Sequence, residues 1–171
     1  MYILAAILFF LLGCSSCASE LEFDSNSSVG DNRAWETWSE CSQLIGEHPC
    51  NFTLLNQHGQ EVELYDYYGK IIIIDLSVMW CGPCQAMAQS ADTIVASYGS
   101  ENVEWLTLLI ENQSGQPPDQ SDLQLWATAN NVESHVLAAD RSMIDTTDAK
   151  TGYPVVSWPT FVVVDQEMIL Q

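Results

Sequence analysis

Basic residues are scarce in this sequence. Its 171 residues include 4 lysines and arginines against 23 aspartates and glutamates, a formal net charge of -19 at pH 7. A surface of this sign repels the phosphate backbone, so no nucleic-acid partner is expected. The apolar fraction of 47% is nevertheless too high for a disordered chain, and the length suits one domain with a short extension.

The N-terminal apolar run is too short to span a membrane. Ile3 to Leu12 is about half as long as a transmembrane helix, but it has the length of a signal-peptide core. Leu11-Leu12-Gly13-Cys14 resembles the bacterial lipobox, in which the cysteine is lipidated and becomes the new N-terminus. We therefore expect residues 1–13 to be a lipoprotein signal peptide and Cys14 to be the lipidation site. An ordinary cleaved signal and an uncleaved anchor are the alternatives.

A polar segment separates this signal from the rest of the chain. Residues 15–31 are rich in serine, asparagine and acidic residues and lack hydrophobic periodicity. Residues 14–34 are thus predicted to be a flexible tether, and residues 35–171 the folded domain. Together these features predict an exported protein, held as a lipoprotein at a membrane of the bacterial periplasm.

Exported chains commonly use cysteine in disulfides. Cys41 and Cys50 flank a turn region with Gly46 and Pro49, just before the first predicted strand. A structural disulfide that closes this short loop is expected. Two independent thiols, or the pairing of one of them with Cys17, are the alternatives.

Hydrophobic periodicity and turn residues predict helices and strands in alternating order. Helices are expected over Trp35 to Ile45, Cys81 to Tyr98 and Ser121 to Asn130, the last opened by a capping box of Ser121 and Gln124. Strands are expected over Asn51 to Leu55, Glu61 to Leu64, Lys70 to Leu76, Val103 to Ile110, Val136 to Ala138 and Phe161 to Val164, with another beginning at Met168.

This order predicts an α/β fold whose central sheet is flanked by helices. The first two strands form a hairpin at the sheet edge, around the turn 56–59. The four consecutive isoleucines at 71–74 indicate a central strand buried on both faces.

The segment Trp80-Cys81-Gly82-Pro83-Cys84 carries the clearest chemical signal. It follows the buried strand and opens a helix, so unpaired backbone N–H groups and the positive helix end favour a thiolate at Cys81. Cys84, one turn further on and more shielded, suits a resolving thiol. The pattern predicts a redox-active Cys81–Cys84 pair that exchanges disulfides.

A C-x-x-C motif can also be half of a zinc site. A structural zinc site needs four nitrogen or sulfur ligands. The sequence has no second C-x-x-C, and His48, His58 and His135 are scattered. Neither a metal nor another cofactor is expected.

Asp75 is an acidic residue inside an apolar strand, six residues before Cys81. Burial of a lone carboxyl raises its pKa, because desolvation disfavours the charged form. Such a group suits proton transfer. The alternative is a solvated aspartate at the end of the strand.

Four segments occur in a specific order and spacing: Asn51-Phe52-Thr53-Leu54 with its hairpin, Gly69-Lys70 before a hydrophobic strand, Trp80 to Cys84, and Ser157-Trp158-Pro159-Thr160 before the strand from Phe161. In this order they resemble the thioredoxin superfamily. The nearest resemblance within it is to the AhpC/TSA-related, membrane-anchored thiol-disulfide oxidoreductases of the TlpA/ResA-like type, over about residues 50–171. The resemblance implies a thioredoxin-like fold with an N-terminal hairpin extension.

The resemblance also implies roles for individual residues. Pro159 would be a cis-proline facing the dithiol; a trans proline at a strand start is the alternative. Asp75 would be the general acid/base for Cys84, although many anchored relatives have asparagine there, and some have an acid where this chain has Met87. Residues expected to contact the substrate are Trp80, Gly82, Pro83, Trp158 and Pro159.

The activity implied is thiol-disulfide exchange with protein disulfides. The Gly-Pro pair between the cysteines resembles that of family members that act as reductases, so the resemblance favours reduction of the substrate. The partners implied are protein disulfide substrates and a membrane or exported thiol electron donor. The alternatives are a non-catalytic binding lipoprotein of the same fold and a carrier of copper through Cys81 and Cys84. A peroxidase would need a separate peroxidatic cysteine motif, which is lacking.

Proteins of this fold normally end with a helix that covers one face of the sheet. The sequence stops at Gln171, a few residues after the last predicted strand. We therefore expect the C-terminal helix to be missing from this sequence. An exposed face of isoleucine and valine would then favour self-association.

Overall fold

A computed structural model describes residues 34–144 and 152–171 of the chain. The predicted signal peptide, most of the tether, Cys14 and Cys17 lie outside the described residues. None of the helices in the described part combines the length and the apolar character needed to cross a bilayer.

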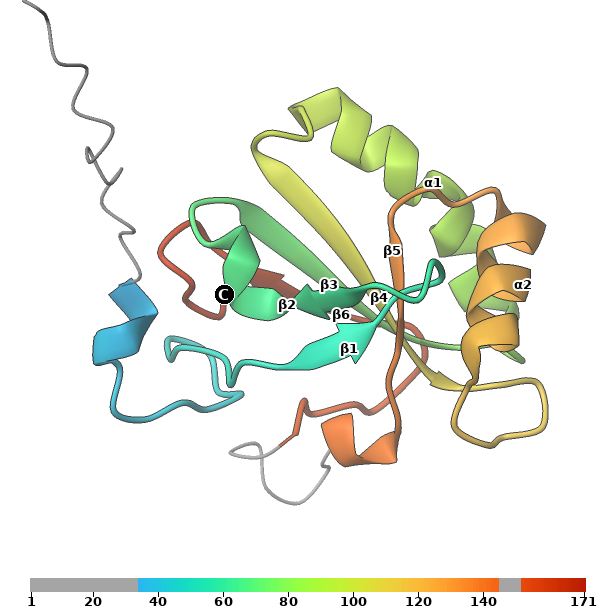
Figure 1. The fold of residues 1–171 in the computed structure, drawn as a ribbon, viewed down its shortest axis with the longest axis horizontal. Helices are drawn as coiled ribbons and strands as arrows, with labels where there is room; N and C mark the ends of the chain where they lie inside the picture. Colours follow the sequence, from blue (N-terminus) through green and yellow to red (C-terminus); the bar gives the residue numbers. More distant parts are fainter. Residues whose placement is uncertain (1–33, 145–151) are drawn as a thin grey trace, which may run out of the picture. The chain divides into compact units, whose positions relative to one another are not determined.

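A four-stranded mixed sheet forms the centre of the fold (Figure 1). The strands β3 (Ile71–Val78), β4 (Val103–Glu111) and β5 (His135–Ala138) are parallel neighbours, and β6 (Thr160–Val164) pairs antiparallel with β3. The strand order is β5-β4-β3-β6, so β3 is an interior strand, as predicted. Ile72 and Ile74 are fully buried, and each such burial stabilises the fold by about 2 kcal/mol.

Two helices pack on this sheet, α1 (Gly82–Tyr98) against β4 and α2 (Gln120–Asn130) against β5. Helix α1 begins and ends close to the predicted residues. The predicted capping box of α2 is wrong in register, because Asp119, not Ser121, is the N-cap. The Asp119 carboxylate accepts from backbone N–H groups of the first turn, while Asp122 bonds back to the N–H of Asp119.

The predicted hairpin is present as a separate two-stranded sheet. Strand β1 (Thr53–Leu55) pairs antiparallel with β2 (Glu61–Glu63), and the turn between them uses Gly59 at a φ of 75°. A bridge from Asn56 to Leu137 joins the hairpin to β5, the edge strand of the main sheet. A short 3-10 helix, η2 (Leu64–Tyr67), follows β2.

The helix expected over 35–45 is wrong. Only a 3-10 turn, η1 (Ala34–Thr37), forms there, and the chain then runs irregularly into a disulfide between Cys41 and Cys50. Trp38 stacks on His48 with ring centroids 3.6 Å apart, and the N–H of Ser42 bonds to the carbonyl of His48. These contacts within a closed loop replace the hydrogen bonds that a helix would make.

The C-terminal segment differs in part from its prediction. A 3-10 turn, η3 (Arg141–Met143), follows β5. After β6 the chain reverses, and Leu170 makes an isolated antiparallel bridge to Val164 in place of the expected strand. One apolar side of the sheet is partly uncovered, as expected: Ile71, Phe161 and Val163 are 39%, 40% and 38% exposed.

Candidate active site

Cys81 and Cys84 lie where the interior strand β3 passes into α1. Cys81 is the N-cap of the helix, its Sγ accepts from the backbone N–H of Cys84 at 3.1 Å, and the two cysteines form a disulfide. Cys84 is fully buried and Cys81 is 6% exposed. In the reduced form, the helix N-terminus would stabilise negative charge on the outer sulfur. The local sequence fixes this geometry, since Pro83 stands in the first turn, where its missing N–H costs nothing.

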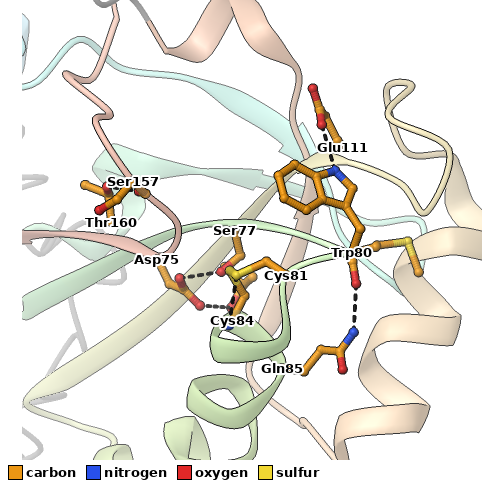
Figure 2. The surroundings of a disulfide bond; sticks show 11 residues. Asp75, Ser77, Trp80, Cys81, Cys84, Gln85, Glu111, Ser157 and Thr160 are labelled. Atoms are coloured by element: carbon orange, nitrogen blue, oxygen red, sulfur yellow. Dashed lines mark hydrogen bonds between the residues drawn. A yellow bond between two sulfur atoms is a disulfide. The ribbon is translucent and has the colours of Figure 1, made fainter.

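Trp80 is held in place beside the motif. Its indole N–H donates to Oε2 of Glu111, 2.9 Å away, and Oε1 of the same carboxylate accepts from the guanidinium of Arg141. Figure 2 shows the indole pointing to Glu111, on the far side of the disulfide from Asp75. Glu111 is buried at the end of β4, whereas Trp80 is 46% exposed. The ring is therefore fixed on one edge and open to a partner.

Asp75 lies on β3 in the surroundings of the disulfide (Figure 2) and is fully buried. Ser77 donates to its Oδ1 at 2.7 Å, and Thr107 of β4 donates to its Oδ2 at 3.4 Å. Burial raises the pKa of Asp75 to about 6, although hydrogen bonds from Ser77, Thr107 and Trp105 oppose this rise. The alternative of a solvated aspartate at a strand end is thus wrong.

The other predicted substrate contacts are at least partly accessible. Gly82 and Pro83 are exposed at the start of α1, and Trp158 and Pro159 are half-buried. The Trp158–Pro159 peptide bond is cis, as expected. Figure 2 includes Ser157 and Thr160, which bracket this pair, among the surroundings of the disulfide, and the Thr160 hydroxyl donates to the Ser157 carbonyl at 2.7 Å.

Four polar residues at this site were not predicted from the sequence: Ser77, Thr107, Glu111 and Arg141. Ser77 could have been found, because it follows Asp75 by two residues and so shares its face of the strand. Thr107 faces Asp75 only through the register of β3 on β4. The contact of Glu111 with Arg141 joins the end of β4 to η3, 30 residues apart in the sequence, and has no local signal.

The metal-ligating residue types within residues 34–144 and 152–171 are dispersed. In these ranges, no three histidine, cysteine, aspartate or glutamate side chains converge as metal ligands would. His48 and His135 each bond to a protein group instead, the first to the carbonyl of Met168 and the second to the side chain of Asn56.

A mixed sheet whose interior strand leads directly into a helix opened by a C-x-x-C motif defines a protein of the thioredoxin fold. The chain belongs to the AhpC/TSA family, whose model matches residues 45–171. It is a thioredoxin-superfamily protein of the TlpA/ResA-like type, which confirms the resemblance seen in the sequence.

Curated relatives are distant but match most of the described chain. The thioredoxin-like protein YneN of Bacillus subtilis is 21% identical over 126 residues, which cover 74% of this chain and 68% of YneN. The thiol-disulfide oxidoreductase ResA of Bacillus thuringiensis is 24% identical over 123 residues, 72% of this chain and 65% of ResA. The match thus spans about two thirds of the length of each relative.

Solved structures share the fold. The thioredoxin domain of a thiol-disulfide oxidoreductase from Bacteroides vulgatus superposes with a TM-score of 0.60 at 16% identity, over 74% of this chain and 85% of that one. The pneumococcal exposed lipoprotein thioredoxin of Streptococcus pneumoniae superposes with a TM-score of 0.56 at 26% identity, over 71% and 86% of the two chains.

Proposed function

We propose that this chain is an exported thiol-disulfide oxidoreductase that reduces protein disulfides through Cys81 and Cys84. The observation that carries the proposal is the position of the pair, with Cys81 capping α1 directly after the interior strand and Cys84 buried behind it. The relatives named above as thiol-disulfide oxidoreductases support the same activity.

The reaction takes place in two exchanges. The Cys81 thiolate attacks one sulfur of the substrate disulfide, so a mixed disulfide forms and one substrate thiolate leaves. Cys84 then attacks Sγ of Cys81, which forms the Cys81–Cys84 disulfide and releases the second substrate thiolate. The substrate gains two electrons and the protein dithiol loses them. An exported or membrane-bound dithiol protein then restores the reduced pair.

Asp75 accepts the proton of Cys84 before the second exchange. A pKa of about 6 leaves this carboxyl mostly ionised at neutral pH, yet basic enough to take a proton from a thiol. The proton goes from the sulfur of Cys84 to the carboxylate and later to water, and the departing substrate thiolate is protonated by solvent. The polar groups around Asp75 belong to β3 and β4, which makes the acceptor part of the rigid sheet.

The substrate binds as an extended segment across the exposed rim of the site. Trp80 offers a flat apolar surface, Gly82 and Pro83 leave the approach to Cys81 open, and the backbone beside Pro159 hydrogen-bonds the segment by strand addition. The fixed edge of Trp80 supports this role, because a ring that is already ordered loses little freedom on binding.

The chain is anchored by lipid on Cys14 after removal of residues 1–13, and it works outside the cytoplasm. The apolar run and lipobox-like sequence support this anchoring, as does the 26% identical pneumococcal protein described as an exposed lipoprotein. Expression of the full chain in a bacterium fed a labelled fatty acid tests it. The label should appear in the wild type and disappear in Cys14→Ser, while Cys17→Ser should keep it.

A trapping experiment tests the exchange itself. The full chain carrying Cys84→Ser should accumulate a mixed disulfide with a protein disulfide substrate, because the resolving thiol is gone. The matched variant Cys81→Ser should trap nothing through the motif, since Cys84, the only thiol left there, is buried; Cys14→Ser and Cys17→Ser are added to both variants so that no other thiol reacts. Mass spectrometry of the tryptic peptides would identify Cys81 in the bond. Absence of a trapped complex, with one soft metal ion bound by the reduced wild type, would instead favour the carrier alternative.

A further inference from the structure

The carboxylate of Asp75 is held by hydroxyl groups and not by a cation. Asp75, Ser77 and Thr107 are all fully buried. Ser77 donates to Oδ1 at 2.7 Å and Thr107 to Oδ2 at 3.4 Å. The main influences on the pKa of Asp75 are burial, which raises it, and hydrogen bonds from neutral side chains, which lower it. Within residues 34–144 and 152–171, the hydrogen-bond donors to this buried carboxylate are thus neutral hydroxyl groups.

The indole of Trp105 determines which way the Thr107 hydroxyl points. Its Nε1–H donates to Oγ1 of Thr107 at 3.1 Å. A hydroxyl has one hydrogen, so once the oxygen of Thr107 accepts from the indole, its own hydrogen is free to turn to Asp75. Trp105 is buried and packs edge-on against Phe161, with centroids 5.7 Å apart. The result is a directed chain from Trp105 through Thr107 to Asp75.

The sheet register brings these groups together. Thr107 of β4 is the register partner of Asp75, and Phe161 of β6 is its partner on the other side. Ser77, two residues along β3, shares the face of Asp75. Of the elements around Asp75, β4 presents Thr107 and Trp105, β6 presents Phe161, and the start of α1 carries Cys84, with Cys81 as its N-cap.

We propose that Ser77 and Thr107 are positioning residues that keep Asp75 an oriented carboxylate, ready to take the proton of Cys84. This inference rests on the proposed function, since it assigns the residues that prepare the proposed proton acceptor. Hydrogen bonds to the charged form of a buried acid favour that form. Without them, desolvation is less opposed, and the pKa of Asp75 rises further.

Single-turnover kinetics of the full chain carrying Cys14→Ser and Cys17→Ser, with the Cys41–Cys50 disulfide kept and the Cys81–Cys84 pair reduced, can isolate this step. An aromatic disulfide reagent whose thiolate absorbs visible light gives two releases: the first on attack by Cys81, the second when Cys84 resolves the mixed disulfide. The rate of each release is followed from about pH 5 to about pH 9. In the wild type, the rate of the second release should rise as the pH increases through the range in which Asp75 ionises.

The variants separate the hydroxyl from the shape of the side chain. Thr107→Val and Ser77→Ala should each move the midpoint of the second release upward by about one pH unit. Thr107→Ser keeps a hydroxyl and should retain the wild-type midpoint, which a purely structural role would not predict. Asp75→Asn should remove the rise of the second release rate with pH that the ionisation of Asp75 causes. Thr53→Val, an exposed substitution on β1, should change neither release.

The outcomes distinguish this inference from the proposed function. If Asp75→Asn removes this rise while Ser77→Ala and Thr107→Val leave its midpoint in place, the inference is wrong and the proposed function stands. A downward movement of the midpoint also overturns the inference. If the wild type gives no second release, the proposed exchange by Cys84 itself fails.

Discussion

Among single residues, Asp75 has the most unusual environment. It is a fully buried acid whose pKa is raised to about 6, first by desolvation and against the opposing hydrogen bonds of Ser77, Thr107 and Trp105. In the unfolded chain the same carboxyl titrates near 3.9. The folded state therefore holds this proton more tightly than the unfolded state does. A group with that difference links the stability of the fold to pH.

The stabilising contribution of protonated Asp75 is complete below pH 3.9 and is lost as the pH rises through 6. The difference in pKa corresponds to ~3 kcal/mol. We predict that the free energy of unfolding of the oxidised wild type falls between pH 4 and pH 8 by roughly this amount relative to Asp75→Asn. Urea titrations of both proteins across this range measure it. The exposed Asp66→Asn is the matched control and should track the wild type; parallel curves for all three would contradict the assignment.

The sequence predicted the residues whose role depends on local pattern. Cys81 and Cys84 were identified because a C-x-x-C after an apolar strand has few other meanings, and Asp75 because a charge inside that strand stands out. Thr107 could not be assigned, because its contact with Asp75 spans 32 residues and depends on strand register. Glu111 has no local sequence signal, yet it is buried and bonded to Trp80.

At the level of secondary structure, β3 and α1 were predicted well because periodicity, Pro83 and the terminal Gly99 all indicate the same boundaries. The predicted helix over 35–45 failed for a physical reason. The spacing of Trp35 and Trp38 fits a helix, but both rings pack with Tyr65 and its neighbours. A disulfide at Cys41 then holds the chain in a loop. Tertiary packing outweighed a weak local preference there.

Glu111, the last residue of β4, connects three parts of the fold. Its carboxylate bonds to Trp80, which directly precedes the cysteine motif, and to Arg141 of η3. We predict that Glu111→Ala lowers the free energy of unfolding by about 1–3 kcal/mol and frees the Trp80 ring, because the indole loses a charged acceptor. Near-ultraviolet circular dichroism would detect the ring's loss of order. Protein-disulfide reduction should show a raised KM with little change in kcat.

The matched control for this prediction is Glu104→Ala. Glu104 lies on the same strand and pairs with Lys70 at 3.0 Å, away from Trp80. The substitution Glu104→Ala should leave the near-ultraviolet circular dichroism signal and the KM unchanged. Equal effects of the two substitutions would show that Glu111 acts only through general stability.

For the molecule as a whole, composition and element order were enough to predict the fold class, and the comparisons confirm it. How much of the apolar sheet face is exposed could not be predicted from the sequence, because the exposure of each side chain depends on what packs against that face. Ile71, Phe161 and Val163 lie on β3 and β6 and are each more than one third exposed. Such a stripe favours contact between copies, although a net charge of -19 opposes it.

We predict that the protein self-associates as its concentration and the salt concentration rise, since salt screens the charge repulsion. The double variant Ile71→Thr and Val163→Thr should shift sedimentation toward the monomer. Leu125→Thr, an equally small change at a 58% exposed position on α2, should not. A wild type that sediments as a monomer and melts in one sharp transition at high salt would contradict this prediction.

The reduction potential of the Cys81–Cys84 pair tests the central claim most directly. The full chain would be equilibrated with thiol buffers of graded potential, and alkylation followed by mass spectrometry would report the fraction oxidised. We predict one two-electron transition near the value of about -270 mV that is typical of thioredoxin. A transition at about -120 to -180 mV would make the protein an oxidant or isomerase and contradict the reductase assignment. Absence of any two-electron transition at these cysteines would contradict disulfide exchange altogether.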